Sequence, residues 1–238
     1  MKQPPSSTIS KINTTAIITC AGNGTRFGSN KLLQNLHNKP VIIWTLESFI
    51  NSSLIDEIII AVRKDDLHIY QDLLQKYYIS AKIVIGDKKR YLSALKGLEE
   101  AQGKYVVIHD GARPLVSTRL IDQVVKQVHE HEAVMTAHNP HTCIKVSKNG
   151  FVEQNLARQE SWMGQTPHAY RKDIIKKAYQ YGLDHDLDGM DDAELVSAVG
   201  FPIKIVQGEI SNIKITQPED LDIATILFTK FFSKELEK

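Results

Sequence analysis

Three glycines and two cations follow one another closely near the amino end of the sequence. Gly22, Gly24 and Gly28 let the backbone turn tightly and approach a ligand, because glycine lacks the Cβ atom that forbids such conformations. Arg26 and Lys31 lie among and just after them, with no acidic residue in between. Successive backbone amides can converge on an anion, and the two cations suit phosphate oxygens. The pattern is typical of a loop that binds a triphosphate.

Two well-known nucleotide-binding patterns fit these glycines less well. The dinucleotide fingerprint G-x-G-x-x-G needs its third glycine one residue earlier than Gly28 and requires no cations in the loop. A Walker A loop has its lysine directly after a glycine, whereas Lys31 follows Ser29 and Asn30. A structural turn after a first strand fits the glycines equally well. It is the two cations that favour phosphate binding.

A second group of polar residues ends a buried strand later in the chain. The apolar run 105–108 is followed by the sequence HDGARP at 109–114. In open α/β sheets, ligands bind beyond the carboxyl ends of the strands. Asp110 is therefore in the right place for chemistry, whereas we expect His109 to be a structural residue at the strand end.

The elements around these residues alternate between strands and helices. Nearly continuous β-branched runs such as 57–62 predict strands buried on both faces of a parallel sheet, and apolar stripes at helical spacing separate them. The alternation predicts an α/β fold with a mostly parallel sheet flanked by helices. We expect strands at 16–19, 57–62, 82–85, 105–108, 133–137, 203–206 and 213–215, and helices at 40–49, 66–78, 90–101, 118–131, 173–181 and from 218 onward.

The period changes after residue 137. Segments 142–146 and 151–156 flank Asn149 and Gly150, a pair that accepts positive φ and so predicts a hairpin. A hairpin alone is marginally stable, so we expect it to pack against a partner chain. The segment that follows, 158–170, is interpreted as a loop.

An acidic stretch at 184–192 opens like a calcium-binding loop. Its first, third, fifth and sixth positions are Asp184, Asp186, Asp188 and Gly189, but Leu195 stands at the twelfth, where a bidentate glutamate belongs. We interpret the stretch as a solvated turn.

Length and composition limit the number of domains and the kinds of partner that can be expected. The 238 residues, of which 42% are hydrophobic and 24% charged, can form one substantial core. We expect a flexible extension at 1–14, which carries no apolar segment of a signal peptide or anchor, and a single domain at 15–238. A net charge of +1 gives no reason to expect nucleic acid or a membrane surface as partner.

The two cysteines are too few for a disulfide framework or a four-cysteine zinc site. Such a low count fits a reduced, cytoplasmic compartment. Cys20 lies next to the glycine loop, but we expect it to pack as a small buried side chain rather than to act as a nucleophile.

Five sequence blocks taken together resemble one enzyme family. The blocks CAGNGTRFG, RYLSALKGL, HDGARP, QTPHAY and NIKITQPEDL resemble, in their order along residues 17–224, the 2-C-methyl-D-erythritol 4-phosphate cytidylyltransferases. The resemblance implies a Rossmann-like nucleotidyltransferase domain with a protruding β-arm, at about 139–160, that pairs two subunits. It also implies transfer of CMP from CTP to that polyol phosphate in isoprenoid precursor synthesis, with Mg²⁺ or another divalent cation. Such a displacement needs positioning and charge neutralisation more than covalent chemistry.

The resemblance also implies roles for particular residues. Charge on the phosphates and on the leaving pyrophosphate would be neutralised by Arg26, Lys31 and Lys214. CTP would be contacted by Ala21, Gly22, Gly24, Gly86, Arg90, Ser93 and Asp110. The acceptor would be held, partly across the dimer, by Asp110, Arg113, Thr142, Arg158 and Thr166. Asp110 would also help to place the metal.

The sequence departs from the family pattern at three places. The spacing from Arg26 to Lys31 is shorter than usual, Asp87 stands where a second glycine is common, and Met190 replaces a threonine. Because the last change removes a hydroxyl near the acceptor phosphate, another polyol phosphate such as ribitol 5-phosphate is an alternative acceptor. A non-catalytic relative would bind CTP without turnover, and an NAD-dependent oxidoreductase would bind NAD instead of CTP.

Overall fold

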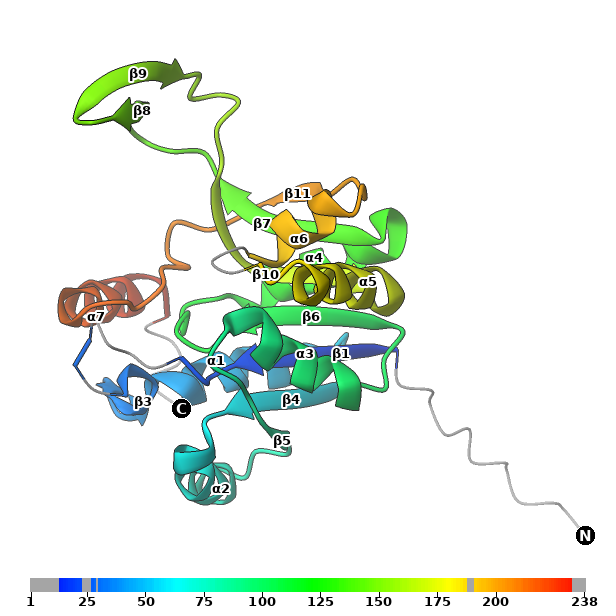
Figure 1. Cartoon of the computed structure of the whole chain (residues 1–238). Coiled ribbons are helices and arrows are strands. Elements are labelled where there is room, and N and C mark those ends of the chain that lie inside the picture. The colour runs from blue at the N-terminus through cyan, green and yellow to red at the C-terminus, as the bar shows by residue number, and fades with distance from the viewer. Residues whose placement is uncertain (1–12, 23–26, 29, 188–190, 233–238) are drawn as a thin grey trace, which may run out of the picture.

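The computed structural model describes residues 13–22, 27–28, 30–187 and 191–232. A seven-stranded sheet forms its centre, with the strand order β11-β7-β10-β6-β1-β4-β5 (Figure 1). Within this sheet β10 runs antiparallel to β6 and β7, and the other pairs are parallel. The expected mostly parallel α/β sheet is thereby confirmed. The strands are β1 (Thr14–Thr19), β4 (Glu57–Val62), β5 (Lys82–Ile85), β6 (Tyr105–Asp110), β7 (Ala133–His138), β10 (Met163–Arg171) and β11 (Lys204–Gln207).

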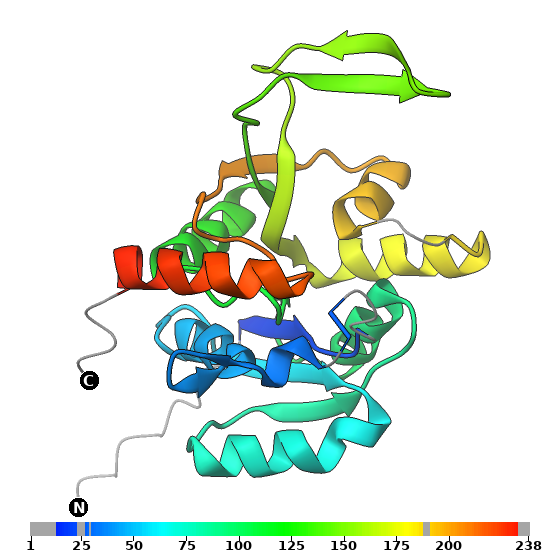
Figure 2. The same cartoon turned by 90° about the vertical axis from the view of Figure 1, so that its left-hand side faces the viewer.

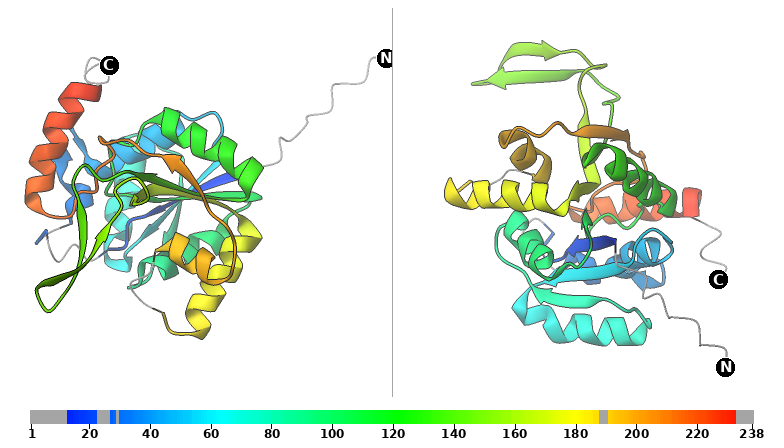
Figure 3. Two further views of the ribbon diagram at one scale, coloured as in Figure 1. Left: turned by 90° about the horizontal axis from the view of Figure 1, so that it is seen from above. Right: turned by 90° about the vertical axis from the view of Figure 1, so that its right-hand side faces the viewer.

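Helices cover both faces of the sheet (Figure 3). One face carries α1 (Val41–Ile50), α2 (Leu67–Lys76), α4 (Thr118–His131) and α7 (Pro218–Phe232), and the other carries α3 (Arg90–Glu100), α5 (Lys172–Asp184) and α6 (Asp192–Ala198). Successive strand residues point to opposite faces, so Ile17 and Ile59 pack in one core and Ile18 and Ile60 in the other. This is why the strands are apolar without alternation. None of the helices described is long and apolar enough to cross a bilayer.

A small substructure supports the segment after the glycine loop. It consists of the 3-10 helix η1 (Lys31–Leu33) and a hairpin of β2 (Asn35–Leu36) and β3 (Lys39–Pro40). Trp44 of α1 donates a 2.8 Å hydrogen bond from Nε1 to the Leu36 carbonyl, and the Phe228 ring of α7 lies against Trp44. The hairpin is therefore tied to α1, which in turn packs against α7. A second 3-10 helix, η2 (Lys64–Asp66), precedes α2.

The loop expected at 158–170 is wrong, because Met163–Arg171 form strand β10 inside the sheet. Pro167 and Gly164 disfavour a strand, because proline cannot donate a hydrogen bond to a neighbouring strand and glycine weakens the pairing. The pairing of β10 with β7 shifts between Gln165 and Ala169, and this irregularity accommodates the proline. The Thr136 hydroxyl of β7 satisfies the Pro167 carbonyl at 2.7 Å.

Three further expectations need correction. Residues 213–215 form no strand; Ile215 N donates a 2.9 Å hydrogen bond to the Ala112 carbonyl, which ties this segment to the loop after β6. The stretch 184–192 is not a solvated turn throughout, because Asp192 is fully buried and begins α6. Thr14, assigned to the flexible extension, is the first residue of β1, whereas 1–12 lie outside the described residues.

The hairpin expected from the Asn–Gly pair is confirmed. Strands β8 (Ile144–Lys148) and β9 (Phe151–Leu156) pair antiparallel around Asn149 and Gly150, whose φ angles are 52° and 82°. The hairpin stands away from the rest of the chain as an arm (Figure 2). It leaves the sheet from β7 and returns to it as β10 (Figure 1).

The strand order creates a place where ligands can bind at one edge of the sheet. From β1 the chain adds β4 and β5 on one side, and then places β6 on the other. The carboxyl ends of these four parallel strands share one edge of the sheet, and ligands bind where the strand order reverses. Ala21 and Gly22, the segment after β5 and Asp110 all lie at that edge.

Candidate active site

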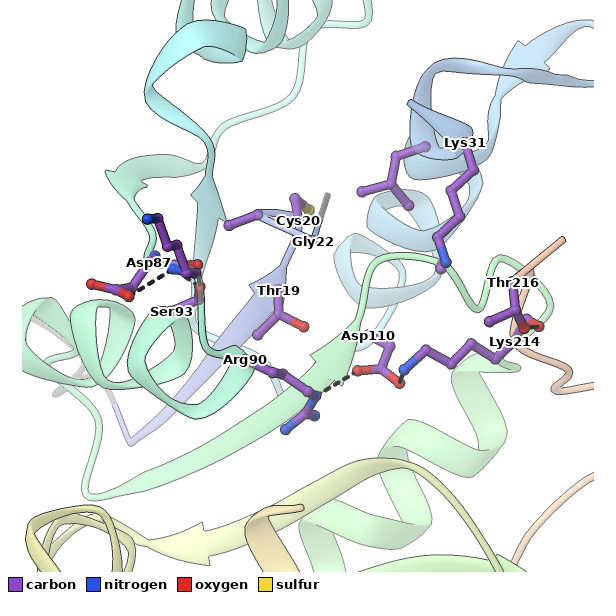
Figure 4. A pocket seen from close by; sticks show the side chains of 14 residues that line it. Thr19, Cys20, Gly22, Lys31, Asp87, Arg90, Ser93, Asp110, Lys214 and Thr216 are labelled. Carbon is purple, nitrogen blue, oxygen red and sulfur yellow. Dashed lines mark hydrogen bonds and ion pairs between the residues drawn. The ribbon is translucent and has the colours of Figure 1, made fainter. Parts of the chain in front are cut away.

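A cavity of about 260 Å³ opens at this edge of the sheet (Figure 4). It brings together predicted site residues from five separate segments of the chain, namely Ala21, Gly22, Lys31, Arg90, Ser93, Asp110 and Lys214. Cys20 also lines it and is 2% exposed, which confirms the expected small buried side chain. Gly24 and Arg26 lie outside the described residues.

Asp110 is held by three cations at the end of β6. Its Oδ1 accepts a 2.8 Å hydrogen bond from Arg90 Nε, and its Oδ2 lies 2.9 Å from Lys214 Nζ and 3.4 Å from Arg113 Nε. Burial of this carboxylate favours its neutral form, but the charges of Arg90, Lys214 and Arg113 outweigh burial and hold the pKa of Asp110 well below its ordinary value. Asp110 is thus a fixed anion surrounded by cations that can also bind phosphate.

A segment without regular structure positions Lys214. Asn212, which is fully buried, donates from Nδ2 to the Thr166 carbonyl at 2.7 Å. The Asn212 carbonyl in turn accepts a hydrogen bond from Arg113 Nη1 at 2.8 Å and another from Gln165 Nε2 at 3.2 Å. These bonds fasten the segment to β10 and to the loop after β6. The Lys214 side chain is 37% exposed and points from this fixed backbone to Asp110 (Figure 4).

Lys31 reaches the same cavity despite its short spacing from the glycine loop. Asn30 caps η1, because its side chain accepts a hydrogen bond from Leu32 N at 3.2 Å. The Asn30 amide also donates to Asp66 at 2.9 Å, which anchors the start of the helix to η2. Lys31 is therefore placed by a local cap, and Figure 4 shows its side chain extending toward Lys214 and Thr216.

The segment after β5 passes very close to the loop after β1. A Cβ atom on Gly86 would lie 2.7 Å from Ala21 Cβ and 2.9 Å from Ser93 Oγ. The Ser93 hydroxyl accepts a hydrogen bond from Asp87 N at 2.9 Å and donates to the Asp87 carbonyl at 2.8 Å. Glycine at 86 and serine at 93 therefore shape the wall of the cavity that also includes Lys88.

Gly86→Ala is expected to lower the free energy of unfolding by about 1–3 kcal/mol, because the added methyl group overpacks the contact with Ala21. The displaced wall should also weaken CTP binding. Urea unfolding and calorimetric titration with CTP measure the two effects. Gly150→Ala, on the arm, is the control with open space around its Cβ; its positive φ destabilises the turn, so it should change stability but not CTP affinity. Unchanged CTP affinity in Gly86→Ala would contradict this wall.

His109 is a structural residue, as expected. It is completely buried, with Nε2 at 3.2 Å from the Arg113 carbonyl and Nδ1 at 2.9 Å from Thr166 Oγ1. Thr166 Oγ1 also accepts a hydrogen bond from Asp110 N at 3.1 Å. Because the Arg113 carbonyl can only accept, Nε2 carries the proton of the neutral ring, and Nδ1 accepts a hydrogen bond from the Thr166 hydroxyl. His109 thereby fixes Thr166 and the backbone of Asp110.

The burial of His109 predicts a loss of stability on mild acidification. Burial lowers the pKa of His109 from 6.5 to about 3. The unfolded chain therefore binds a proton near pH 6.5 that the folded chain does not bind until about pH 3, so stability falls with pH through this window. Between pH 7 and pH 5 the titration of His109 should lower the free energy of unfolding by about 2 kcal/mol.

Urea unfolding at both pH values measures this loss, and His109→Gln is the matched control. Glutamine keeps a hydrogen-bond donor and an acceptor but does not titrate. Between pH 7 and pH 5 the free energy of unfolding of the variant should therefore fall by about 2 kcal/mol less than that of the wild type. Equal losses in the two proteins would contradict the neutral buried histidine.

A second cavity of about 360 Å³ adjoins the first. The two share Lys88, Arg90, Asp110 and Lys214. The second adds polar groups from β10 and the loop after β6, namely Arg113, Gln165, Thr166 and His168. The predicted acceptor residues Arg113 and Thr166 therefore lie beside the first cavity, and two ligands bound in these cavities would meet at Arg90, Asp110 and Lys214.

Within one chain, Thr142 and Arg158 are not brought to this place. Both are exposed at the base of the arm, and neither is found among the described residues that line the two cavities. Arg158 lines a separate hollow with His138 and His141. Their predicted contact with the acceptor therefore requires a second subunit.

Several residues that hold the site together escaped the sequence analysis. Asp192 binds Arg90 from behind, and Tyr179 and His168 lie against Asp192. Their sequence neighbourhood, an acidic turn and an apparent loop, gave no sign of burial. The clue was the capping-box pattern of Asp191 and Glu194, which marks a helix start at Asp192.

The cavity offers limited protein ligands for a divalent metal. No group of three or more His, Cys, Asp or Glu side chains suited to a metal ion is found in the described ranges. Asp110 is already bound by Arg90, Lys214 and Arg113, but a carboxylate has about four lone-pair sites and so has room for one more partner. Mg²⁺ is often held by one or two carboxylates together with substrate phosphates. The residues fit a metal that is bound jointly with a triphosphate.

An open α/β sheet with cations around paired cavities at its switch point can bring a phosphorylated ligand and a second substrate together, as a nucleotidyltransferase requires. The family model for 2-C-methyl-D-erythritol 4-phosphate cytidylyltransferase matches residues 14–230. The chain belongs to this cytidylyltransferase family.

Individual relatives agree with the family match. A 2-C-methyl-D-erythritol 4-phosphate cytidylyltransferase of Caldanaerobacter subterraneus subsp. tengcongensis is 34% identical over 227 residues, which cover 92% of this chain and 100% of the relative. One of Alkaliphilus metalliredigens is 38% identical, covering 88% and 90%. The crystal structure of 4-diphosphocytidyl-2C-methyl-D-erythritol synthase from Anaerococcus prevotii superposes with a TM-score of 0.81 at 32% identity, covering 91% and 98%.

Proposed function

We propose that this protein transfers CMP from CTP to 2-C-methyl-D-erythritol 4-phosphate, in the cytoplasm, as a homodimer that uses Mg²⁺ or another divalent cation. The reaction serves isoprenoid precursor synthesis. The observation that carries the proposal is the meeting of two cavities at Arg90, Asp110 and Lys214. One cavity lies against the glycine loop and accepts the nucleotide, and the other accepts the polyol phosphate. The two free cysteines, Cys20 and Cys143, are in keeping with a reducing compartment.

The reaction joins the two substrates at the shared wall. A phosphate oxygen of the acceptor attacks the α-phosphorus of CTP, a new P–O bond forms, and the bond to the β-phosphate oxygen breaks as pyrophosphate leaves with the electron pair. Lys214 stands at the junction and stabilises the charge that develops on the α-phosphate. Lys31, which also lines the nucleotide cavity, neutralises the leaving pyrophosphate, and Arg26 is proposed to assist it.

The metal would be held by triphosphate oxygens together with Asp110. When bound, it supplies charge neutralisation between the phosphates. The three cations around Asp110 disfavour a dication in the absence of nucleotide, because like charges repel. Mg²⁺ is therefore expected to bind with CTP.

The arm supports the proposed homodimer. It presents exposed apolar side chains, of which Phe151 is 78% and Val152 59% exposed. Apolar surface of this kind on an isolated hairpin marks an interaction site. In a symmetric pair each arm would bring Thr142 and Arg158 to the acceptor cavity of the other subunit.

Turnover with purified acceptors tests the function. CTP is incubated with 2-C-methyl-D-erythritol 4-phosphate or with ribitol 5-phosphate, and pyrophosphate release is measured for each. Product with the first acceptor and little with the second is the expected result. Product with ribitol 5-phosphate alone would replace the proposed acceptor, and CTP binding without turnover under either acceptor would indicate a non-catalytic relative.

A further inference from the structure

Asp192 is the most deeply buried acidic residue of the described chain. Its Oδ2 accepts a 2.7 Å hydrogen bond from Arg90 Nη1, and its Oδ1 accepts one of the same length from Tyr179 Oη. His168 Nδ1 lies 3.6 Å from Oδ2 and has no hydrogen-bond partner of its own. A carboxylate removed from water in this way needs compensating partners, and Arg90 is the strongest of them.

The Arg90 guanidinium is held by two carboxylates at different nitrogen atoms. Nε donates to Asp110 and Nη1 donates to Asp192, at 2.8 Å and 2.7 Å. Because the guanidinium is planar and rigid, two such bonds fix both its position and its orientation. The Arg90 side chain nevertheless stays 27% exposed and lines both cavities. It is accessible to ligands and anchored from behind.

The local sequence explains why Asp192 points inward. Asp191 caps α6 by accepting a hydrogen bond from Glu194 N at 2.8 Å, while the Glu194 side chain accepts one from Asp191 N. This capping box fixes the backbone at Asp192, the first residue of the helix. The helix N-terminus also favours a negative charge there. Leu195, fully buried against α5, holds the helix in place.

We propose that Asp192 is a positioning residue for CMP transfer, which holds the Arg90 guanidinium at the junction of the two cavities and, through Arg90, holds Asp110. This inference rests on the function proposed above. Among the described residues that line the two cavities, Asp192 is not found. Without Asp192, the Arg90 guanidinium would keep only its hydrogen bond from Nε to Asp110, and its terminal nitrogen atoms would be free to move. The geometry that lowers the barrier to reaction would then be lost.

A double-mutant cycle tests this role. The four proteins are the wild type, Asp192→Asn, Arg90→Gln, and the double variant, and kcat/KM for CTP is measured at saturating acceptor. Asp192→Asn should lower kcat/KM by about 10- to 100-fold. If Asp192 acts through Arg90, the double variant should be no worse than Arg90→Gln alone, because the second change removes an anchor that no longer has a guanidinium to hold.

Tyr179→Phe is the matched structural control. It removes the other hydrogen bond to Asp192 and leaves the contact with Arg90 in place. We expect it to lower the thermal midpoint but to keep kcat/KM within about threefold of the wild type, since it disturbs packing without releasing the guanidinium.

Several results would overturn the proposal. One is a kcat/KM of Asp192→Asn within threefold of the wild-type value. Another is a double variant whose fold-loss in kcat/KM equals the product of the two single fold-losses. Should Asp192→Asn fail to fold, the comparison of Arg90→Gln with the double variant decides, because the pair removes both buried charges together. A double variant that also fails to fold assigns Asp192 to folding alone and overturns its role in transfer.

The same cycle on ligand binding separates this proposal from the function on which it rests. Calorimetric titration with a non-hydrolysable CTP analogue measures the coupling of Asp192 and Arg90 without an acceptor. A wild type that binds the analogue but does not convert 2-C-methyl-D-erythritol 4-phosphate refutes the proposed function and still reports the coupling. A wild type that turns over normally with no coupling refutes the positioning role alone.

Discussion

Lys214→Ala is expected to lower kcat by about 100- to 1000-fold, the scale of removing one group that stabilises transition-state charge. Lys214 lies at the junction of the two cavities, 2.9 Å from Asp110, where the α-phosphate would react. Folding should be little affected, because the side chain is 37% exposed and Asp110 keeps Arg90 and Arg113 as partners. Single-turnover rates with saturating CTP and acceptor, together with thermal unfolding, measure the two properties.

Lys204→Ala is the matched control for this prediction. Lys204 is an exposed lysine on β11, so its removal changes the net charge equally without touching the site. It should retain normal turnover, and Lys31→Ala should share the loss of Lys214→Ala because Lys31 lines the nucleotide cavity. A Lys214→Ala protein with a kcat near that of the wild type would refute the mechanism.

A mixture of two inactive variants is expected to regain about a quarter of the wild-type activity if, as proposed, each site of the dimer uses Lys214 of one chain and Arg158 of the other. One variant is Lys214→Ala and the other is Arg158→Ala, on the arm. In a mixed dimer, one site combines both defects and the other has neither. Random exchange makes half of the dimers mixed, so a quarter of all sites are intact.

The outcome distinguishes an arm that acts on the partner from one that acts on its own chain. The two proteins are mixed in mild denaturant so that their subunits exchange, and the activity of the mixture is then compared with that of each variant treated alone. An arm that serves its own chain gives no gain over the average of the two. Two samples of Lys214→Ala, mixed with each other and treated in the same way, control for effects of the procedure.

The sequence predicts the α/β class and the strand ends because both depend on local patterns. Runs such as 57–62 are apolar on both faces, which a covered parallel sheet requires, and Asp110 stands out because polar residues abruptly follow such a run. Lys31 and Lys214 are 183 residues apart, as the difference of their numbers gives, and nothing in their spacing shows that they line one cavity. The family resemblance is what linked them before the structure did.

The remainder of the site depends on contacts that leave no local pattern. Strand β10 contains Pro167 and a pairing irregularity, so its place in the sheet comes from its neighbours β6 and β7 and not from its own propensity. Asp192 looks like one more acid of a solvated turn, yet the packing of α6 on α5 buries it behind Arg90. In both cases tertiary packing overrides the local signal.

The path of β10 links two properties of the molecule that are otherwise separate. This strand is the returning limb of the arm, and its residues Gln165, Thr166 and His168 also form a wall of the acceptor cavity. Residues 163–165 pair with β7 and residues 168–171 pair with β6, so this one strand connects the arm to the wall of the cavity. The proposed subunit pairing and the proposed acceptor site would therefore both depend on β10. Substitutions at the arm, far from any substrate, should be able to retune which alcohol phosphate the enzyme prefers.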